Sequence, residues 1–219
     1  TPSGAGTCSV TATMAGDSNY NSVSSSATNV VIAAKAITLK ADDKSATYTG
    51  SAVSITNSYT LTGTLVGSDA ISGVTYTYST ANPTNVGTYT ITPSVAVFST
   101  GSAANYTITY STGTLTISKA NQGALSITST TGTYGSNVTL TTSGGTTNGT
   151  VTYVLNSGPC TLLNGVLTPS GAGTCSVTAT MAGDSNYNSV SSSATNVVIA
   201  AKAITLKRSE EHTSELQSH

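Results

Sequence analysis

The first 207 of the 219 residues contain no arginine, glutamate, histidine or tryptophan, and their only charged side chains are six lysines and five aspartates. General acid–base catalysis relies on histidine, glutamate, aspartate or lysine with matched pKa values. We therefore expect no enzyme activity and no cofactor. A net charge near zero gives no electrostatic basis for binding nucleic acid or an anionic membrane surface. No apolar run approaches the roughly 20 residues that a membrane-spanning helix needs.

All the missing residue types except tryptophan appear in the last twelve positions, 208–219, which read RSEEHTSELQSH. This segment resembles the in-frame translation of a sequencing adapter at the end of a metagenomic fragment. We interpret it as an artefactual tail and exclude it from the fold prediction. The alternative is a genuine polar C-terminal tail.

One stretch occurs twice, because residues 1–40 are repeated letter for letter as residues 168–207. Self-similarity at a long fixed period is typical of a tandem array of modules. A Lys-Ala step recurs at Lys35, Lys119 and Lys202, and divides the period into two lengths that each suit a small domain. The predicted domains are 1–35, the C-terminal half of a truncated module; 36–119 and 120–202, two complete and different modules; and 203–207, the start of the next.

Threonine, serine, glycine, valine and alanine dominate, which favours strands joined by turns and predicts an all-β fold. Residues 120–202 contain seven short alternating segments, typical of an immunoglobulin-like (Ig-like) β-sandwich. Asn164-Gly165 is a strong two-residue hairpin signal within them. In residues 36–119 we expect a hairpin from Tyr106–Tyr110 and Thr114–Ile117, and a helical turn within the weakly strand-like Leu65–Ile71.

The three cysteines indicate whether the protein is secreted or cytosolic. Cys160 and Cys175 flank the Asn164-Gly165 turn, and a bridge closing a loop of this size stabilises a fold by roughly 3 kcal/mol. We expect a disulfide, which suits a secreted protein; the alternative is two buried thiols, as in a cytosolic protein. Cys8 is equivalent to Cys175 by the repeat, so we expect its partner before residue 1.

Two acidic clusters are candidate calcium ligands, although calcium prefers six or more oxygens and several carboxylates. In Asp184-Ser-Asn186 the competing interpretation is an Asx turn that shapes a loop. In Asp42-Asp43 the competing interpretation is a solvated strand end beside Lys44. The turn and the strand end are favoured, and no metal site is expected.

Tyrosines are the main aromatic residues and are candidates for contacts with a glycan. Tyr187 is expected to be a packed tyrosine at a sandwich corner rather than a ligand contact. A further set lies at alternating strand positions, where cross-strand packing competes with a glycan-binding face. This set consists of Tyr76, Tyr78, Tyr89, Tyr106 and Tyr110.

Two family resemblances follow from local motifs. Residues 36–117 resemble the MBG domain of bacterial surface proteins through five segments, namely Ile37–Ala41, Lys44–Gly50, Val86–Tyr89, Asn105–Ile108 and Gly113–Ile117. Residues 120–199 resemble the Ig-like repeats of large bacterial adhesins through Gly173–Ala179 and Ala182–Tyr187. These resemblances imply an extracellular or cell-surface location and adhesion, and they carry no catalytic residue.

The sequence therefore predicts stalk or spacer repeats of a large secreted or cell-surface bacterial adhesin that projects a distal binding region. The alternatives are a module that binds glycan or matrix directly, and accessory linker domains of a large extracellular enzyme. The expected partners are host glycan or extracellular matrix, reached through the parent protein, and neighbouring repeats of the same chain.

Overall fold

A computed structural model describes residues 3–206, so the predicted tail at 208–219 lies outside the described residues. The all-β prediction is confirmed: the described chain consists of strands and connecting turns, with one 3₁₀ turn, η1 (Ala103–Asn105). Within residues 3–206, no helix is long and apolar enough to cross a membrane. The chain divides into two compact units, residues 1–120 and 121–219. The finer domain boundaries stay predictions.

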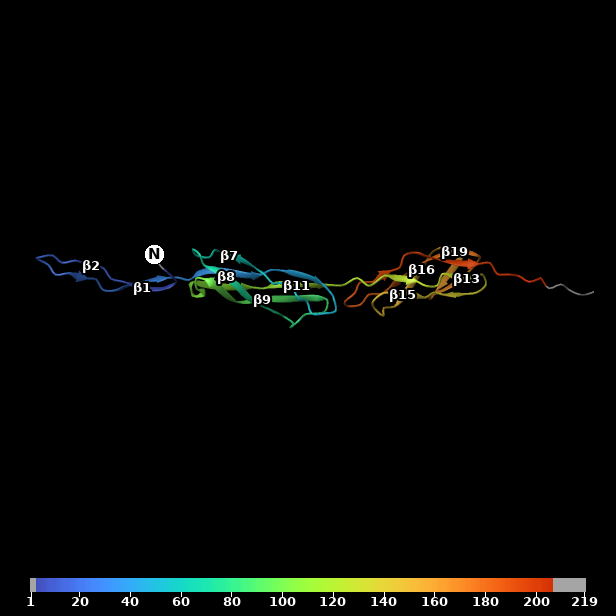
Figure 1. Cartoon of the computed structure of the whole chain (residues 1–219), viewed down its shortest axis with the longest axis horizontal. Helices are drawn as coiled ribbons and strands as arrows, with labels where there is room; N and C mark the ends of the chain where they lie inside the picture. The colour runs from blue at the N-terminus through green and yellow to red at the C-terminus, as the bar shows by residue number, and fades with distance from the viewer. Residues whose placement is uncertain (1–2, 207–219) are drawn as a thin grey trace, which may run out of the picture. The chain divides into compact units, whose positions relative to one another are not determined.

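Unit 1 begins with an antiparallel ribbon, which we call the N-terminal ribbon (residues 6–32). Strand β1 (Gly6–Val10) pairs with β4 (Thr28–Ile32), and β2 (Thr13–Met14) pairs with β3 (Val23–Ser24) (Figure 1). Almost all of its side chains are exposed. The ribbon therefore has the pairing of a sheet but no second layer packed against it.

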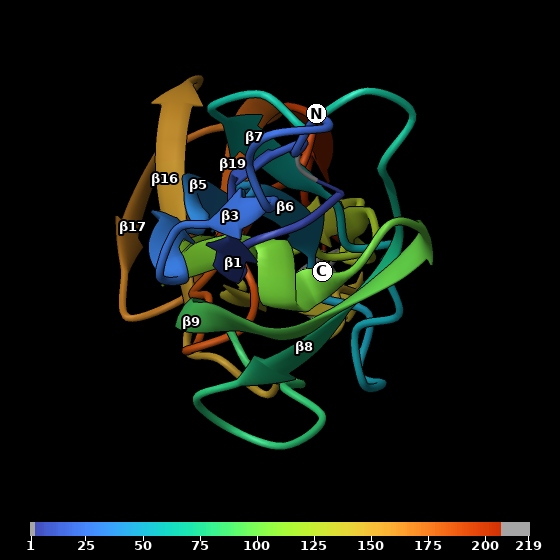
Figure 2. The ribbon, with the colours of Figure 1, turned by 90° about the vertical axis from the view of Figure 1, so that its left-hand side faces the viewer.

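The rest of unit 1 is a module of two packed sheets, with strand orders β10-β5-β7 and β6-β11-β9-β8. Figure 2 shows β8 and β9, the longest pair, running alongside each other. The strands are β5 (Lys35–Ala41), β6 (Lys44–Thr47), β7 (Tyr59–Thr62), β8 (Ala70–Tyr78), β9 (Gly87–Thr100), β10 (Tyr106–Ser111) and β11 (Gly113–Ser118).

The first and last strands of this module form one bent parallel pair. Strand β5 pairs in parallel with β10, β6 pairs in parallel with β11, and the offset between partners is the same in both ladders. The segment β5–β6 crosses from one sheet to the other at Asp42-Asp43. The segment β10–β11 crosses beside it, at Thr112. The expected hairpin between β10 and β11 is therefore wrong. Each strand pairs with a distant partner, and the short link between them is a crossing between sheets.

The core of the module lies between its two sheets. Ala41, Ile91, Leu115 and Ile117 are buried there, and the alternation along β5 and β11 directs every second side chain inward. Within the segment Leu65–Ile71, the amide of Asp69 donates to the carbonyl of Val66 (3.0 Å), so the expected helical turn is replaced by one hydrogen-bonded turn that leads into β8.

Unit 2 is a sandwich of two layers. One layer has the order β13-β21-β19-β16, with β20 added to β19; the other contains the pair β12-β15 and the sheet β14-β18-β17. The strands are β12 (Leu125–Ile127), β13 (Thr131–Thr133), β14 (Val138–Thr139), β15 (Thr142–Gly144), β16 (Val151–Ser157), β17 (Cys160–Leu163), β18 (Val166–Pro169), β19 (Gly173–Met181), β20 (Val190–Ser191) and β21 (Thr195–Ala200).

The topology of unit 2 agrees with the predicted Ig-like sandwich. All its pairs are antiparallel except β13 with β21, which run in parallel. The hairpin predicted at Asn164-Gly165 joins β17 to β18, and both residues have positive φ (48° and 76°), as a type I′ turn requires. The core between the layers contains Leu140, Leu167 and Val197.

Candidate functional site

The disulfide expected between Cys160 and Cys175 is present and connects the two layers of unit 2. Cys160 lies on the edge strand β17, and Cys175 lies on the central strand β19 of the other layer. Their Cα atoms are 6.2 Å apart, and both side chains are buried in the core. The bridge therefore holds β17 against β19 from within the sandwich. Among the described residues, Cys8 is the free cysteine, and it is exposed.

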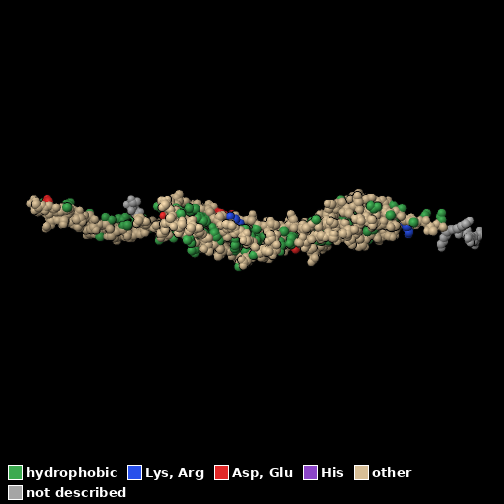
Figure 3. Space-filling view, in the orientation of Figure 1, with side chains coloured by type: hydrophobic (Ala, Val, Ile, Leu, Met, Phe, Trp, Pro, Cys, Tyr) green, Lys and Arg blue, Asp and Glu red, His purple; other side chains and the backbone are tan. Residues whose placement is uncertain are grey.

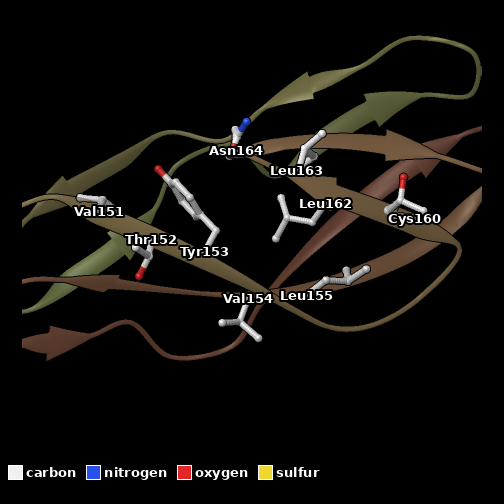
Figure 4. Close-up of a pocket in the computed structure, with 11 residues that line it drawn as sticks. Val151, Thr152, Tyr153, Val154, Leu155, Cys160, Leu162, Leu163 and Asn164 are labelled. Atoms are coloured by element: carbon white, nitrogen blue, oxygen red, sulfur yellow. The ribbon is translucent and has the colours of Figure 1, made fainter.

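An open groove of about 810 Å³ lies between β16 and the β17–β18 turn of unit 2. Figure 4 shows the Tyr153 ring reaching toward Asn164 across the groove, while Val154 points to the opposite side of β16. The Tyr153 hydroxyl donates to the carbonyl of Leu140 (3.2 Å). The exposed apolar side chains nearby are Val154 and Leu163. The residues that line the groove are all uncharged.

The groove was missed by the sequence reasoning. Its signal is a doubled apolar pair in each of two neighbouring strands, Val154-Leu155 and Leu162-Leu163. A doubled pair breaks the alternation of a half-buried strand, because one of the two side chains must face away from the core.

The Asp42-Asp43 cluster lies at the crossing between the two sheets of unit 1. The hydroxyls of Ser58 (2.6 Å) and Thr60 (2.7 Å) donate to the two carboxylate oxygens of Asp42. These two hydrogen bonds and the charge of Lys44 lower the pKa of Asp42. Oδ1 of Asp43 accepts from the amide of Thr114 (2.8 Å). Both carboxylates thus bind protein donors that hold the crossing in place.

Asp184 shapes a loop, in agreement with the favoured interpretation. Its Oδ1 accepts from the amides of Asn186 and Tyr187, each at 2.8 Å, which is the hydrogen-bond pattern of an Asx turn. Tyr187 is half-buried beside this turn. In residues 3–206, there is no group of three or more His, Cys, Asp or Glu side chains with the geometry to hold a metal ion.

The five tyrosines of the possible glycan face do not share one surface. Tyr76, Tyr78 and Tyr89 pack against the core of unit 1, and burial raises the pKa of Tyr76. Tyr110 is partly exposed, and its hydroxyl accepts from the amide of Ala96 (2.8 Å). Packing therefore accounts for at least three of the five.

Tyr106, the fifth, is buried and stacks on Phe98 with ring centroids 5.3 Å apart. Its hydroxyl donates to Asp69 (2.7 Å) and accepts from the amide of Val66 (2.8 Å). Burial and the hydrogen bond to Asp69 raise the pKa of Tyr106. The residue ties the turn before β8 to β10, which is a structural role.

A comparison with protein families finds a match within unit 1. Residues 37–116 match the model of the MBG domain (YGX type). No curated protein matches the chain.

Three solved structures give weak overall matches, each 13% identical to the chain. The structure titled "PcdhgB3 EC1-4 in 50 mM HEPES" has a TM-score of 0.33, and the match covers 90% of this chain and 57% of that one. The N-terminal part of the bacterial S-layer protein SbsC has a TM-score of 0.25, with 74% and 44% covered. Murine CEACAM1b has a TM-score of 0.27, with 76% and 100% covered. At these TM-scores the likenesses carry no argument about function.

Proposed function

Starting from the MBG domain at residues 37–116, we propose that the chain is a piece of the stalk of a large secreted or cell-surface bacterial adhesin. Its role is mechanical: it carries load between an anchored end and a distal binding region, and it has no catalytic role. The MBG domain and the intramolecular disulfide are consistent with an extracellular protein.

The observation that carries this proposal is how each complete module begins and ends. In the two-sheet module of unit 1, the first strands β5 and β6 pair in parallel with the last strands β10 and β11. In unit 2, the early strand β13 pairs in parallel with the last strand, β21. Both modules therefore join their entering and leaving segments by a parallel ladder.

A parallel ladder in this position resists tension. When the two ends of a module are pulled apart, its entering and leaving strands slide past one another along their length. All the hydrogen bonds of the ladder, which are evenly spaced in a parallel pair, then bear the force together. In an antiparallel pair opened from one end, the bonds break one after another.

The surface and the disulfide fit the same role. Figure 3 shows a visible face made mostly of backbone and of side chains that are neither hydrophobic nor charged, with few charged side chains. Such a surface offers little attraction to charged partners along the stalk. The disulfide limits how far unit 2 can extend, because the segment between Cys160 and Cys175 stays closed as a loop.

The test is single-molecule force spectroscopy on the whole chain, held at its two ends. We expect unit 2 to unfold at high force in this geometry. The matched control keeps the protein and moves the handles to residues 150 and 182. These residues lie at one end of the antiparallel β16–β19 pair, where the amide of Ala182 donates to the carbonyl of Thr150 (3.0 Å).

Pulling at residues 150 and 182 opens the β16–β19 pair from its end, so the unfolding force should fall well below that of end-to-end pulling. Equal forces in the two geometries would contradict a load-bearing role for the parallel ladder. If the modules unfold at forces no higher than those that stretch an unstructured chain, the stalk proposal itself is rejected.

A second candidate function is direct binding to glycan or matrix protein, favoured by the groove beside β16. The exposed Leu163, which lines the groove, is the side chain that a ligand would cover. The test is retention of the chain, displayed on an oligomeric carrier, on mucin and on matrix protein. Retention that Leu163→Asp abolishes and Val154→Asp does not would support binding in the groove; no retention would contradict it.

A further inference from the structure

We propose that the open edge of β16 in unit 2 binds the same edge of a second copy of the chain, with the two strands antiparallel. This goes beyond the mechanical role and beyond a ligand in the groove, because it assigns the chain a surface for self-association. Strand β16 stands last in the order β13-β21-β19-β16. Among the described residues, it pairs with β19 on one side and with no strand on the other.

The backbone groups of every second residue in β16 point to this open side. The amide of Ala182 donates to the carbonyl of Thr150 (3.0 Å), so these two residues form a hydrogen-bonded pair in the register of the β16–β19 ladder. Hydrogen-bonded and non-hydrogen-bonded pairs alternate along an antiparallel ladder, so residues 152 and 154 also bond to β19. The N–H and C=O groups that face the open side are those of Val151, Tyr153 and Leu155.

Strand β16 lacks the features that usually protect an edge strand from pairing. It is the longest edge strand of unit 2, with seven residues against four in β17 and three in β13. It contains no charged residue and no proline, and its irregularity with β19 comes after Leu155. Natural edge strands are commonly short, charged, bulged or interrupted by proline. Residues 151–155 are therefore a regular edge that another strand can join.

This edge is its own complement. When two copies pair antiparallel with Tyr153 on the two-fold axis, Val151 of each copy lies opposite Leu155 of the other. The open-side groups of residues 151, 153 and 155 then meet in three pairs, which form about six hydrogen bonds because each pair exchanges two. On the outer face, the exposed Thr152 lies opposite the exposed Val154. Such cross-strand pairs stabilise a sheet.

The surroundings of the edge favour a second copy over a charged partner. The residues that line the groove beside β16 are all uncharged, and Figure 4 shows them on both sides of it. Two such surfaces meet without repulsion between like charges, and neither offers a charge that a charged peptide could bind. A strand added to β16 also lies along the mouth of the groove, where Leu163 is 74% exposed.

Antiparallel pairing sets the relative direction of the two chains. Figure 1 shows β16 and β19 running along the length of unit 2. Two copies of unit 2 joined through β16 therefore point in opposite directions along that length. Chains anchored on one surface point the same way, so this contact suits chains from two facing cells. This last step rests on the proposed surface location, whereas the pairing itself does not.

The experiment measures self-association of the full chain by sedimentation velocity over a dilution series. The series reaches about 1 mM, because the pairing of one short strand is a small interface. We expect an equilibrium between monomer and dimer. In the dimer, amide exchange should slow at Val151, Tyr153 and Leu155. It should hardly change at Thr152 and Val154, whose backbone groups already bond to β19 in the monomer.

Charged substitutions at residues 152 and 154 test the partner and the direction together. The variant Thr152→Lys with Val154→Lys places lysine opposite lysine twice, so the dimer should weaken at least about tenfold. The variant Thr152→Lys with Val154→Glu places lysine opposite glutamate twice, so it should dimerise at least as well as the original chain. In a parallel, in-register pairing, this second variant would instead place like charges opposite each other.

Asn196→Lys with Val198→Lys is the matched control, because it adds the same charge at two exposed residues of β21, in the same sheet but away from the open edge. It should dimerise like the original chain. No dimer up to about 1 mM, or equal dimerisation of the original chain and the double-lysine variant, would overturn the proposal. Loss of the dimer in the lysine–glutamate variant would overturn the antiparallel register.

Discussion

Gly113 shows how one residue governs the crossing between the sheets of unit 1. A Cβ atom built at this position would lie 2.4 Å from the carbonyl oxygen of Ala41 and 2.9 Å from that of Asp42. These are backbone atoms of the neighbouring crossing, which cannot rotate away. The bent parallel pair therefore needs glycine at residue 113 because two backbones approach closely there.

We expect Gly113→Ala to destabilise unit 1 by about 1–3 kcal/mol, the cost of forcing extra volume into a packed site. Gly73→Ala in β8 is the control, since a Cβ there meets nothing within 4 Å. It should be neutral or slightly stabilising. Denaturant unfolding of the two variants measures the difference, and equal midpoints would show that the crossing is not tightly packed.

Asp42 makes the same crossing sensitive to pH. Its pKa is lowered by the hydrogen bonds from Ser58 and Thr60. An unfolded Asp titrates near about 3.9, so the folded group binds its proton less readily than the unfolded one. Its contribution to stability is complete above about pH 4 and is lost as the pH falls through the lower folded pKa.

We expect Asp42→Asn to lower stability at neutral pH by about 1 kcal/mol, the usual size of such hydrogen bonds. The difference from the original chain should shrink as the pH drops below about 4. Thr60→Val, which removes one of the two donors, should give a smaller effect of the same sign. Unfolding curves over a pH series measure this; a constant difference at all pH values would contradict it.

At the scale of elements, the hairpin predicted in unit 2 is present and the one predicted in unit 1 is not. Asn164-Gly165 joins β17 to β18 as expected, since the turn and both strands are adjacent in sequence. The link at Thr112 looks like a second hairpin, yet β10 and β11 lie in different sheets. Their partners, β5 and β6, come from the start of the module and leave no local signal.

The disulfide acts on elements of unit 2 alone, because it joins β17 to β19. Its loop of about 15 residues predicts a loss of about 3 kcal/mol on removal. We expect Cys160→Ala with Cys175→Ala to lower the melting temperature of unit 2 on the order of 10–20 °C. Calorimetry should show the transition of unit 1 unchanged.

Adding a reductant to the original chain is the companion measurement, and it should reproduce the shift of the double variant. Cys8→Ala is the matched control, because this free thiol lies in the N-terminal ribbon. It should leave both transitions in place. A reductant that moved the transition of unit 1, or that moved neither, would contradict the assignment of the bridge to the core of unit 2.

At the scale of the whole molecule, the repeated 40 residues separate local from tertiary effects. Both copies have the same pairing register and the same Asx turn, whether or not a second layer is present. Their burial differs completely, and burial is what converts a paired ribbon into a stable layer. In unit 2 this burial comes from residues 121–167, which supply the opposite layer.

The candidate sites likewise divide into those that could be predicted from the sequence and those that could not. The Asx turn at Asp184 and the Cys160–Cys175 pair could be predicted, because both depend on residues close in sequence. The groove beside Val154 and the hydrogen bonds of Asp42 could not, because their atoms come from separate strands. Tyr106 shows the limit: its position in a strand was evident, but its partner Asp69 comes from a turn far along the chain.

The sequence by itself determined the all-β class, the repeat and the hairpin at Asn164-Gly165. Each depends on composition or on hydrogen bonds between nearby residues. Only the tertiary structure decided the parallel pairing of first and last strands, the crossing at Gly113 and the burial of Val177 but not Val10. These features depend on contacts between segments far apart in the chain, and such contacts form only when the layers pack.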